Sequence, residues 1–445
     1  MISINYVVHK FGGEITKDKA NLELIPDLIK QEDVNPIVVF SAIRGVTDVL
    51  ANIVAESFSH SQAKELIVEL RSKHEIFFDR SYNDVKMFKA KFEKVLSQLE
   101  SILNGIIFQR QTPKVAQDLV LSFGERILSP IIELYLKNSS YNPGILSPED
   151  FLIIEGESTI DLEKSQSKFN LIIDKYHDND CLIVPGYYGI GNDGQIKLLG
   201  RSGTDYSATA ISNITNAGRV VIWKSVSGFM TADPKLVSNA RIVTNLTYTE
   251  VSELAGFGAN VMHDQSIFPA KIKAIPIEIS QFGSNKFSTV ISDKSTRLGI
   301  KSITSQSNLL HLSISNVSSR SGDKGIAKLL DSVLKEKLKI KFLNTQISHS
   351  EIILAKENEI PLINFLESEG IMRTQIETEE NLGLITLIGE DIMNQSFKIS
   401  SLTTYFGDKK IDVVKFVTNK HSILIVVHQD YINSVVSDLH GLIFD

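Results

Sequence analysis

The chain has 445 residues, more than one hydrophobic core usually organises, so we expect two or three domains. Hydrophobic residues make up 42% and charged residues 22%, which is typical of a folded chain and excludes a disordered or low-complexity protein. The 46 Lys and Arg against 53 Asp and Glu give a formal net charge of −7, which argues against a general nucleic-acid-binding protein but leaves room for local basic pockets.

Other features of the sequence narrow the class further. The single cysteine, Cys181, cannot form an internal disulfide or furnish a cysteine zinc site. No apolar run approaches the length of a membrane span, and the N-terminus lacks the basic-then-apolar pattern of a secretion signal. We therefore expect a cytoplasmic protein that binds neither membrane nor nucleic acid.

The first 60 residues alternate between strand and helix patterns. Residues 6–13 form a β-rich run that ends in two glycines, and a helix is predicted over 17–31. Residues 36–42 form a continuous apolar strand of the kind that is buried on both faces of a parallel sheet, and Gly45 begins another helix. This order predicts an α/β domain with a largely parallel sheet.

The same alternation continues beyond a mostly helical, charged insert at about 60–110. The further elements expected are helices at 115–136 and 204–215 and strands at 181–184, 196–199 and 220–223, with the turn residues 191–194 between the first two of these strands. Strand 220–223 is apolar throughout, which indicates a buried position in the sheet.

The pattern changes near residue 300. A strand at 309–314 leads to a helix at 324–338, and a strand at 382–388 leads to a helix at about 393–406. Each pair is followed by a second strand and helix, so this region is predicted to be a tandem repeat of a βαββαβ-like unit.

These patterns divide the chain into two regions. The first domain is expected at 1–295 and the tandem repeat at 300–445. Within the repeat, the first unit covers about 305–380 and the second 381–445, and the two can intertwine.

A cation and two glycines stand at the end of the first predicted strand. Lys10 is followed by Gly12 and Gly13, so an ammonium group lies near backbone amides that no Cβ atom shields. Such a corner can bind a phosphate group and offset its charge. An ordinary turn after a strand can have the same residues, and the motif alone leaves both interpretations open.

A glycine-spaced loop precedes the predicted helix at 204–215. Arg201 offers a planar guanidinium that suits a carboxylate, and Thr204 and Asp205 stand where the helix dipole would meet an anionic substrate. The alternative is that Thr204 or Asp205 only caps the helix. Capping would not require the neighbouring arginine and two glycines, so we favour binding.

Two further features have a functional and a structural interpretation. Glu125 follows Gly124 inside an apolar helical pattern, where a helix packed against a pocket would let Glu125 receive an ammonium group; a solvated helix face is the alternative. The turn-rich segment 227–235 follows strand 220–223, at the edge where open α/β sheets bind ligands, although a plain surface loop has a similar composition.

Six motifs stand in one order along the chain: Lys10 to Gly13, Ser41 to Thr47, Phe123 to Arg126, Gly200 to Tyr206, Thr231 to Pro234 and Phe257 to His263. Together they resemble the aspartate kinases, which belong to the amino-acid-kinase superfamily and carry paired C-terminal ACT regulatory domains. Residues 384–389 and 435–444 are similar to the second ACT unit of that family. The resemblance therefore covers nearly the whole chain.

The resemblance implies an amino-acid-kinase-like αβα sandwich followed by two α+β, ferredoxin-like ACT domains. It implies an enzyme that transfers the ATP γ-phosphoryl group to the β-carboxylate of L-aspartate, the first step towards lysine, threonine and methionine. It further implies ATP as cofactor with Mg²⁺ bridging its phosphates, a homodimer or higher homo-oligomer, and feedback by lysine or threonine through the ACT domains. Such a reaction depends on positioning and charge compensation.

The resemblance also assigns roles to residues. Lys10 and Asp205 would be catalytic, Lys10 by stabilising the transferring phosphoryl group and Asp205 by orienting Lys10 or the reacting groups. The aspartate-binding residues would be Ser41, Ala42, Thr47, Glu125 for the ammonium, Arg201 for the α-carboxylate, and Thr204. The ATP-binding residues would be Lys10, Gly12, Gly13, Lys224, Ser225, Met230, Asp233, Lys235 and Asn260, and no protein residue would bind a metal directly.

Several positions on the nucleotide side depart from the family pattern. Lys224 and Ser225 stand where Thr-Asp is usual, and Met230, Lys235 and Asn260 replace a tyrosine, an arginine and a lysine. Lys224 could supply the cation that is missing at Asn260. Two interpretations follow: an active kinase with an altered ATP site, which we favour because the main residues for the phosphoryl group and aspartate are present, or a weakened paralogue that senses amino acids as a regulatory subunit.

Lys341 is informative about which amino acid could act as the feedback effector. Relatives that sense lysine tend to have an acidic residue following the short strand where Lys341 stands, and its ammonium would repel that of a lysine ligand. A solvated strand residue is the alternative. We expect feedback by an amino acid, with lysine disfavoured as a simple ligand.

Overall fold

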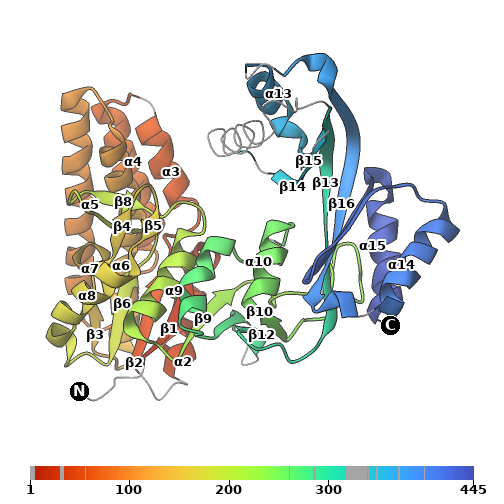
Figure 1. Cartoon of the computed structure of the whole chain (residues 1–445). Coiled ribbons are helices and arrows are strands. Elements are labelled where there is room, and N and C mark those ends of the chain that lie inside the picture. The colour runs from red at the N-terminus through yellow and green to blue at the C-terminus, as the bar shows by residue number, and fades with distance from the viewer. Residues whose placement is uncertain are drawn as a thin grey trace. The chain divides into compact units, whose positions relative to one another are not determined.

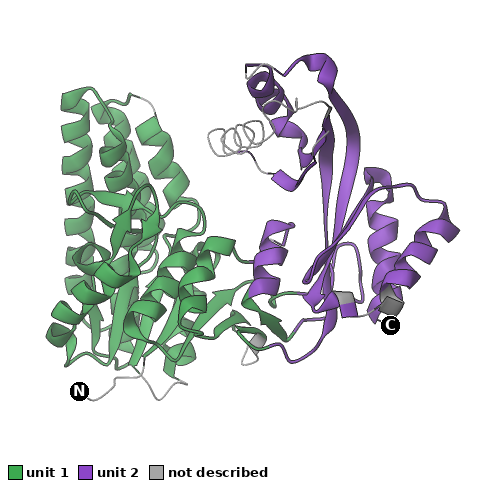
Figure 2. Ribbon diagram, viewed as in Figure 1, with its two compact units in different colours: residues 1–229, 244–248, 262–294 green, residues 230–243, 249–261, 295–445 purple. Residues whose placement is uncertain are grey.

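The computed structural model describes residues 6–30, 35–55, 57–259, 261–283, 287–315, 338, 340–346, 349–368, 371–394 and 396–444. The chain forms two compact units, which are coloured separately in Figure 2. The first unit comprises Met1–Phe229, Thr244–Tyr248 and Met262–Lys294, and the second comprises Met230–Val243, Thr249–Val261 and Ser295–Asp445. None of the helices in the described ranges is long and apolar enough to cross a membrane.

The first unit is built on a sheet in the order β10-β12-β11-β9-β1-β2-β6-β3 (Figure 1). Its parallel part consists of β11 (Ile277–Gln281), β9 (Arg219–Lys224), β1 (Tyr6–Phe11), β2 (Asn35–Phe40), β6 (Cys181–Pro185) and β3 (Pro143–Ile145). Beyond β11, β12 (Phe287–Ser292) is antiparallel to it and pairs in parallel with β10 (Asn245–Thr247). The carboxyl ends of the parallel strands therefore share one edge, and the predicted largely parallel sheet is confirmed.

Helices cover both faces of this sheet. One face carries α1 (Gly13–Thr16), α2 (Lys19–Lys30), α3 (Val46–Ala55), α4 (His60–Glu75), α5 (Val85–Gln109) and α6 (Lys114–Asn138). The other face carries α8 (Leu162–Ile172), α9 (Gly203–Thr215) and α11 (Phe268–Ile272). Because both faces are covered, strands such as β2 are apolar and buried almost throughout. All residues of α9 are buried, which small side chains such as Ala208 and Ala210 permit.

A smaller sheet in the first unit corrects one prediction. It has the order β5-β4-β7-β8 and comprises β4 (Ile153–Glu155), β5 (Thr159–Ile160), β7 (Tyr188–Gly191) and β8 (Ile196–Leu198), beside the short helix α7 (Pro148–Phe151). The predicted strands at 181–184 and 196–199 do not pair, because the first is β6 of the main sheet and the second is β8. The turn at 191–194 joins β7 to β8. The strand β7 was not predicted because it is short and contains glycines at 189 and 191.

The second unit is built on an antiparallel sheet in the order β14-β15-β13-β16-β18-β17. Its elements are β13 (Gly299–Ser315), β14 (Ile340–Thr345), β15 (His349–Ala355), α13 (Glu359–Ser368), β16 (Ile376–Glu390), α14 (Ser396–Lys409), β17 (Val413–Thr418), β18 (Ser422–His428) and α15 (Ile432–Phe444). The long strands β13 and β16 pair with each other and contribute to three hydrophobic clusters. One cluster joins Leu310 to Leu362 of α13, and a second joins Ile300 to Leu402 of α14 and Leu439 of α15. The third joins Leu309 of β13 to Leu384 of β16. This α+β arrangement agrees with the expected C-terminal fold.

Two segments that precede residue 295 belong to the second unit. In residues 230–243, Thr231 Oγ1 lies 2.9 Å from Nε2 of the buried His440 on α15. The helix α10 (Tyr248–Gly256) is linked to β13 by an ion pair of 2.9 Å between the buried Glu250 and Lys301. Local patterns did not predict that these two segments pack in the second unit, because the residues that they contact are distant in the chain. The division into a catalytic domain at 1–295 and a regulatory region at 300–445 stays a prediction.

Two sequence predictions concern the region around β14. The helix at 324–338 lies outside the described residues except for Leu338. Lys341 lies on β14, and its Nζ donates a hydrogen bond of 2.9 Å to the carbonyl of Gly256 at the end of α10. A lysine near a helix C-terminus can satisfy the last carbonyl groups, so Lys341 has a structural partner.

Candidate active site

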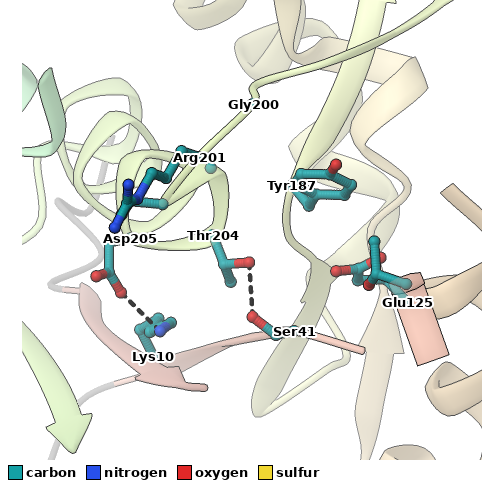
Figure 3. Close-up of a pocket in the computed structure, with 11 residues that line it drawn as sticks. Lys10, Ser41, Glu125, Tyr187, Gly200, Arg201, Thr204 and Asp205 are labelled. Atoms are coloured by element: carbon teal, nitrogen blue, oxygen red, sulfur yellow. Dashed lines mark hydrogen bonds and ion pairs between the residues drawn. The ribbon is translucent and has the colours of Figure 1, made fainter. Parts of the chain in front are cut away.

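A pocket of about 490 Å³ opens in the first unit, at the edge where the parallel strands end (Figure 3). Lys10 enters it from the end of β1, and Ser41 from the residue after β2. Thr204 and Asp205 come from the first turn of α9. The lining residues are Lys10, Ser41, Thr47, Glu125, Tyr187, Gly200, Arg201, Ser202, Gly203, Thr204 and Asp205. This edge is where open α/β sheets bind ligands.

Three charged side chains form the cation end of the pocket. Lys10 Nζ lies 2.6 Å from Asp205 Oδ1, and Lys224 Nζ at the end of β9 lies 2.8 Å from Asp205 Oδ2. Lys10 and Asp205 are buried, whereas the Lys224 side chain is 22% exposed. One carboxylate therefore pairs with two ammonium groups, and the cluster carries an excess positive charge.

This charge imbalance shifts the pKa values of the cluster. Burial acts to raise the pKa of Asp205, but the Lys10 and Lys224 cations outweigh burial and hold that pKa below its usual range. Burial lowers the pKa of Lys10; Asp205 opposes this effect and Lys224 adds to it, so the pKa lies below its usual range. A bound anion would balance the second ammonium group.

The first turn of α9 directs its polar side chains to the pocket instead of capping the helix. The N-cap residue is Ser202, which has a φ of +59° and makes no side-chain cap hydrogen bond. Thr204 Oγ1 accepts a hydrogen bond of 2.7 Å from Ser41 Oγ, and Asp205 binds the two lysines. The alternative that Thr204 or Asp205 only caps the helix is therefore wrong.

A buried carboxyl group forms the acidic end of the pocket. Glu125 lies on α6, and its Oε1 accepts a hydrogen bond of 3.0 Å from the Ala42 amide. Its Oε2 is buried and has no hydrogen-bond partner among the described residues. Gly124 permits this close approach, because a Cβ atom there would lie 2.8 Å from Ala42 Cβ. The alternative of a solvated helix face is wrong, since Glu125 is 2% exposed.

Burial also changes the protonation of Glu125. It raises the pKa of this carboxyl group to about 8, against the opposing effect of the Ala42 amide. Without a ligand, Glu125 therefore holds a proton at neutral pH. A cationic group beside Oε2 would favour the ionised form, so this end of the pocket suits an ammonium group.

Sequence similarity identifies the family. Residues 5–280, more than half of the chain, match the model of the amino acid kinase family. The chain belongs to the amino acid kinase family. The matched region contains every residue that lines the pocket.

Relatives of this amino acid kinase include proteins named aspartokinases. The bifunctional aspartokinase/homoserine dehydrogenase of Buchnera aphidicola is 25% identical over 98% of this chain, which spans 56% of the length of that relative. The aspartokinase of Chlamydia pneumoniae is 24% identical over 98% of this chain and 97% of its own length. The crystal structure of Escherichia coli aspartokinase III in complex with aspartate and ADP has a TM-score of 0.81 at 21% identity, covering 99% of this chain and 100% of that chain. At this identity the structural similarity shows a shared fold.

The pocket of this amino acid kinase brings together most residues predicted to bind aspartate or the phosphoryl group. Those that line it are Lys10, Ser41, Thr47, Glu125, Arg201, Thr204 and Asp205. Lys224 joins them through Asp205, and Ala42 through Glu125. The exposed Arg201 lies on the side of Lys10 and Asp205 (Figure 3).

Other predicted nucleotide residues do not line this pocket. Gly12 and Gly13 lie at the start of α1, and a Cβ atom at Gly12 would stand 3.0 Å from Lys10 Nζ. Ser225 is exposed just after β9. The remaining positions are Met230, Asp233 and Lys235, which belong to the second unit, and Asn260, which lies outside the described residues. The nucleotide contacts stay a prediction.

Four lining residues were not among the predicted site residues: Tyr187, Gly200, Ser202 and Gly203. Tyr187 follows the end of β6, so the rule that ligands bind at the carboxyl ends of parallel strands could have identified it. Ser202 lies inside the glycine-spaced loop, but a serine there carries no distinctive signal. For finding residues that line the pocket, position relative to the sheet edge was therefore more informative than residue type.

Proposed function

We propose that this amino acid kinase is an aspartate kinase that transfers the γ-phosphoryl group of ATP to the β-carboxylate of L-aspartate and forms 4-phospho-L-aspartate. The proposal depends on the opposite character of the two pocket ends. Lys10 and Lys224 share Asp205 at one end, whereas Glu125 has a buried, unpartnered oxygen in the described structure at the other. An acidic α-amino acid matches both ends, with carboxylates for the cations and an ammonium for Glu125. The names of the relatives support the same substrate.

The proposed reaction joins two anions, so charge compensation is the main task of the protein. A β-carboxylate oxygen of aspartate attacks the γ-phosphorus, the bond to the β,γ-bridging oxygen breaks, and ADP leaves with the electron pair. No general base is needed, because the attacking carboxylate is already ionised. Lys10 would stabilise the transferring phosphoryl group, and Asp205 would position the ammonium groups of Lys10 and Lys224.

ATP would enter this site as its Mg²⁺ complex. The two pocket carboxyl groups do not fit a resident metal ion, because Asp205 is paired with two lysines and buried Glu125 favours its protonated form. Across the described residues, no group of three or more His, Cys, Asp and Glu side chains is placed to hold a metal. Since Mg²⁺ is often bound largely through substrate phosphates, we assign it to the nucleotide and derive no protein step from it.

We further propose that the region at 300–445 regulates the enzyme. Lysine or threonine would bind there, and the chain would act in the cytoplasm as a homodimer or higher homo-oligomer. A second crystal structure of Escherichia coli aspartokinase III with a similar fold is a complex with lysine and aspartate, which supports an amino-acid effector. Lysine stays disfavoured as a simple ligand, because the positive charge of Lys341 on β14 would repel the ammonium group of a bound lysine.

A second candidate function is an amino-acid sensor with little turnover. It is favoured by Lys224, whose ammonium takes one oxygen of the carboxylate that would orient Lys10. We prefer the kinase because Lys10 retains its own contact of 2.6 Å with the other oxygen. A sensor would bind aspartate, lysine or threonine in calorimetry without binding ATP.

Trapping of the acyl phosphate with hydroxylamine tests the kinase directly. With ATP, Mg²⁺ and L-aspartate, we expect the hydroxamate to accumulate, and we expect none when ATP is omitted. A panel of acidic amino acids would define the acceptor. Hydroxamate no higher than that of a Lys10→Ala control, at saturating ATP and aspartate, would reject catalysis.

A further inference from the structure

Tyr187 has a backbone conformation that is unusual for a large side chain. Its φ is +76°, in the left-handed region that bulky residues rarely adopt. Two hydrogen bonds hold it there: its amide donates to Ser207 Oγ at 3.0 Å, and its carbonyl accepts from the Leu199 amide at 2.8 Å. A residue that the surrounding fold keeps in such a conformation is a candidate for a functional role.

The ring of Tyr187 packs against the start of α9. A Cβ atom at Gly203 would lie 2.9 Å from Tyr187 Cδ2 and 3.5 Å from Tyr187 Cα. Gly203 therefore leaves room for this ring and for the side chain of Leu199, so the second glycine of the loop has a packing role that does not involve a phosphate. Tyr187 and Gly203 both line the pocket, so this contact forms part of its wall.

Tyr187 lies at the acidic end of the pocket. Figure 3 shows it on the side of Glu125, opposite Lys10 and Asp205. Burial raises the pKa of Tyr187 to about 12, and the charge of Glu125 contributes to the increase. The phenol is therefore neutral, and its oxygen can accept a hydrogen bond.

We propose that Tyr187 determines specificity for the amino group of the substrate: its hydroxyl oxygen and Glu125 Oε2 together accept hydrogen bonds from the substrate ammonium. This inference rests on the proposed function and adds the reason why the pocket would prefer an α-amino acid to a dicarboxylate without an amine. Succinate has both carboxylates of aspartate but no ammonium, so it would leave the two acceptors without a donor.

The test compares Tyr187→Phe with a matched control, Tyr188→Phe. Tyr188 is the next residue in the chain and is 1% exposed, but it does not line the pocket. In Tyr187→Phe we expect the Kd of aspartate to rise about fivefold, from the loss of one hydrogen bond, with kcat and the KM of ATP changed less than about twofold. The preference for aspartate over succinate should fall by the same factor as the affinity. Tyr188→Phe should change neither.

A second pair of variants tests the placement of the ring. Gly203→Ala would place a Cβ atom 2.9 Å from both Tyr187 Cδ2 and Leu199 Cβ, so we expect it to displace this part of the pocket wall, including the Tyr187 ring, and to weaken aspartate binding. Gly105→Ala is the control, since a Cβ atom at this helical glycine on α5 would have no neighbouring atom within 4 Å among the described residues. Thermal unfolding measured for each variant separates a local effect from a loss of folding.

Calorimetry with aspartate gives a result whether or not the enzyme turns over. Unchanged aspartate affinity in Tyr187→Phe, or an equal loss in Tyr188→Phe, would overturn the role of Tyr187. If the wild-type chain binds aspartate but forms no hydroxamate, the proposed kinase fails while the role of Tyr187 in binding is still decided by the variants. A wild-type chain that binds no aspartate would overturn both proposals.

Discussion

The two ends of the pocket differ in how complete they are without a ligand. At the cation end, Lys10 and Lys224 are both within 2.8 Å of Asp205, so this arrangement is formed by the protein alone. At the acidic end, Glu125 Oε2 is buried with no hydrogen-bond partner in the described ranges, so a bound cation would complete it. The difference indicates that charge stabilisation is preorganised in the fold, whereas recognition of the amino group depends on the ligand.

Removal of Lys10 should have the largest effect. We expect Lys10→Ala to lower kcat about 1,000-fold, because a buried cation next to the transferring phosphoryl group would be lost. The affinity for aspartate in calorimetry should change much less, since Glu125 and Tyr187 remain. A fall in kcat of less than about tenfold would show that Lys224 alone can supply the charge.

Replacement of the shared carboxylate should have the next largest effect. In Asp205→Asn, the two ammonium groups lose the charge that holds them together, and we expect kcat to fall about 100-fold. Steady-state kinetics of Asp205→Asn, Lys224→Met and the double variant measure the coupling between them. The double variant should be more active than the product of the single effects predicts, and strictly additive effects would show that Lys224 does not act through Asp205.

Removal of the charge of Glu125 should affect aspartate more than ATP. We expect Glu125→Gln to raise the KM of aspartate about 30-fold, because an amide cannot balance the substrate ammonium. The KM of ATP should change less than about twofold. Equal effects on both substrates would mean that Glu125 mainly stabilises the contact between α6 and Ala42.

The raised pKa of Glu125 predicts that aspartate binding depends on pH in the wild type but not in Glu125→Gln. Because the substrate ammonium binds the ionised carboxylate and the pKa is about 8, the aspartate affinity of the wild type should increase about fivefold between pH 7 and pH 8. Binding at pH 7 should release about one proton, which calorimetry in buffers of different ionisation enthalpy measures. Glu125→Gln should show neither effect.

The raised pKa of Glu125 also determines how the free energy of unfolding changes with pH. Between the ordinary carboxyl pKa of 4.5 and the folded-state value of about 8, the folded chain holds a proton that the unfolded chain has lost. Glu125 therefore contributes a decrease in the free energy of unfolding as pH rises through this range. Glu125→Gln should remove that decrease, as measured by denaturant unfolding at several pH values.

Local patterns predicted much of the first unit. The apolar runs identified β1, β2, β6 and β9, and the loop of Gly200 to Gly203 identified the start of α9. The prediction failed for the pairing of the strands at 181–184 and 196–199, because strand partners depend on contacts across the sheet. The packing of residues 230–243 in the second unit was missed for the same reason.

The sequence by itself determined where the chemical groups stand along the elements: Lys10 near the end of an apolar strand, Asp205 in the first turn of a helix, and Glu125 inside an apolar helix. Only the tertiary structure decided that Lys224 shares Asp205 with Lys10 and that Tyr187 lies at the end of the pocket with Glu125. Local periodicity reports the burial of one element at a time. Distances between side chains of remote segments depend on strand order and register, which arise when the sheet assembles.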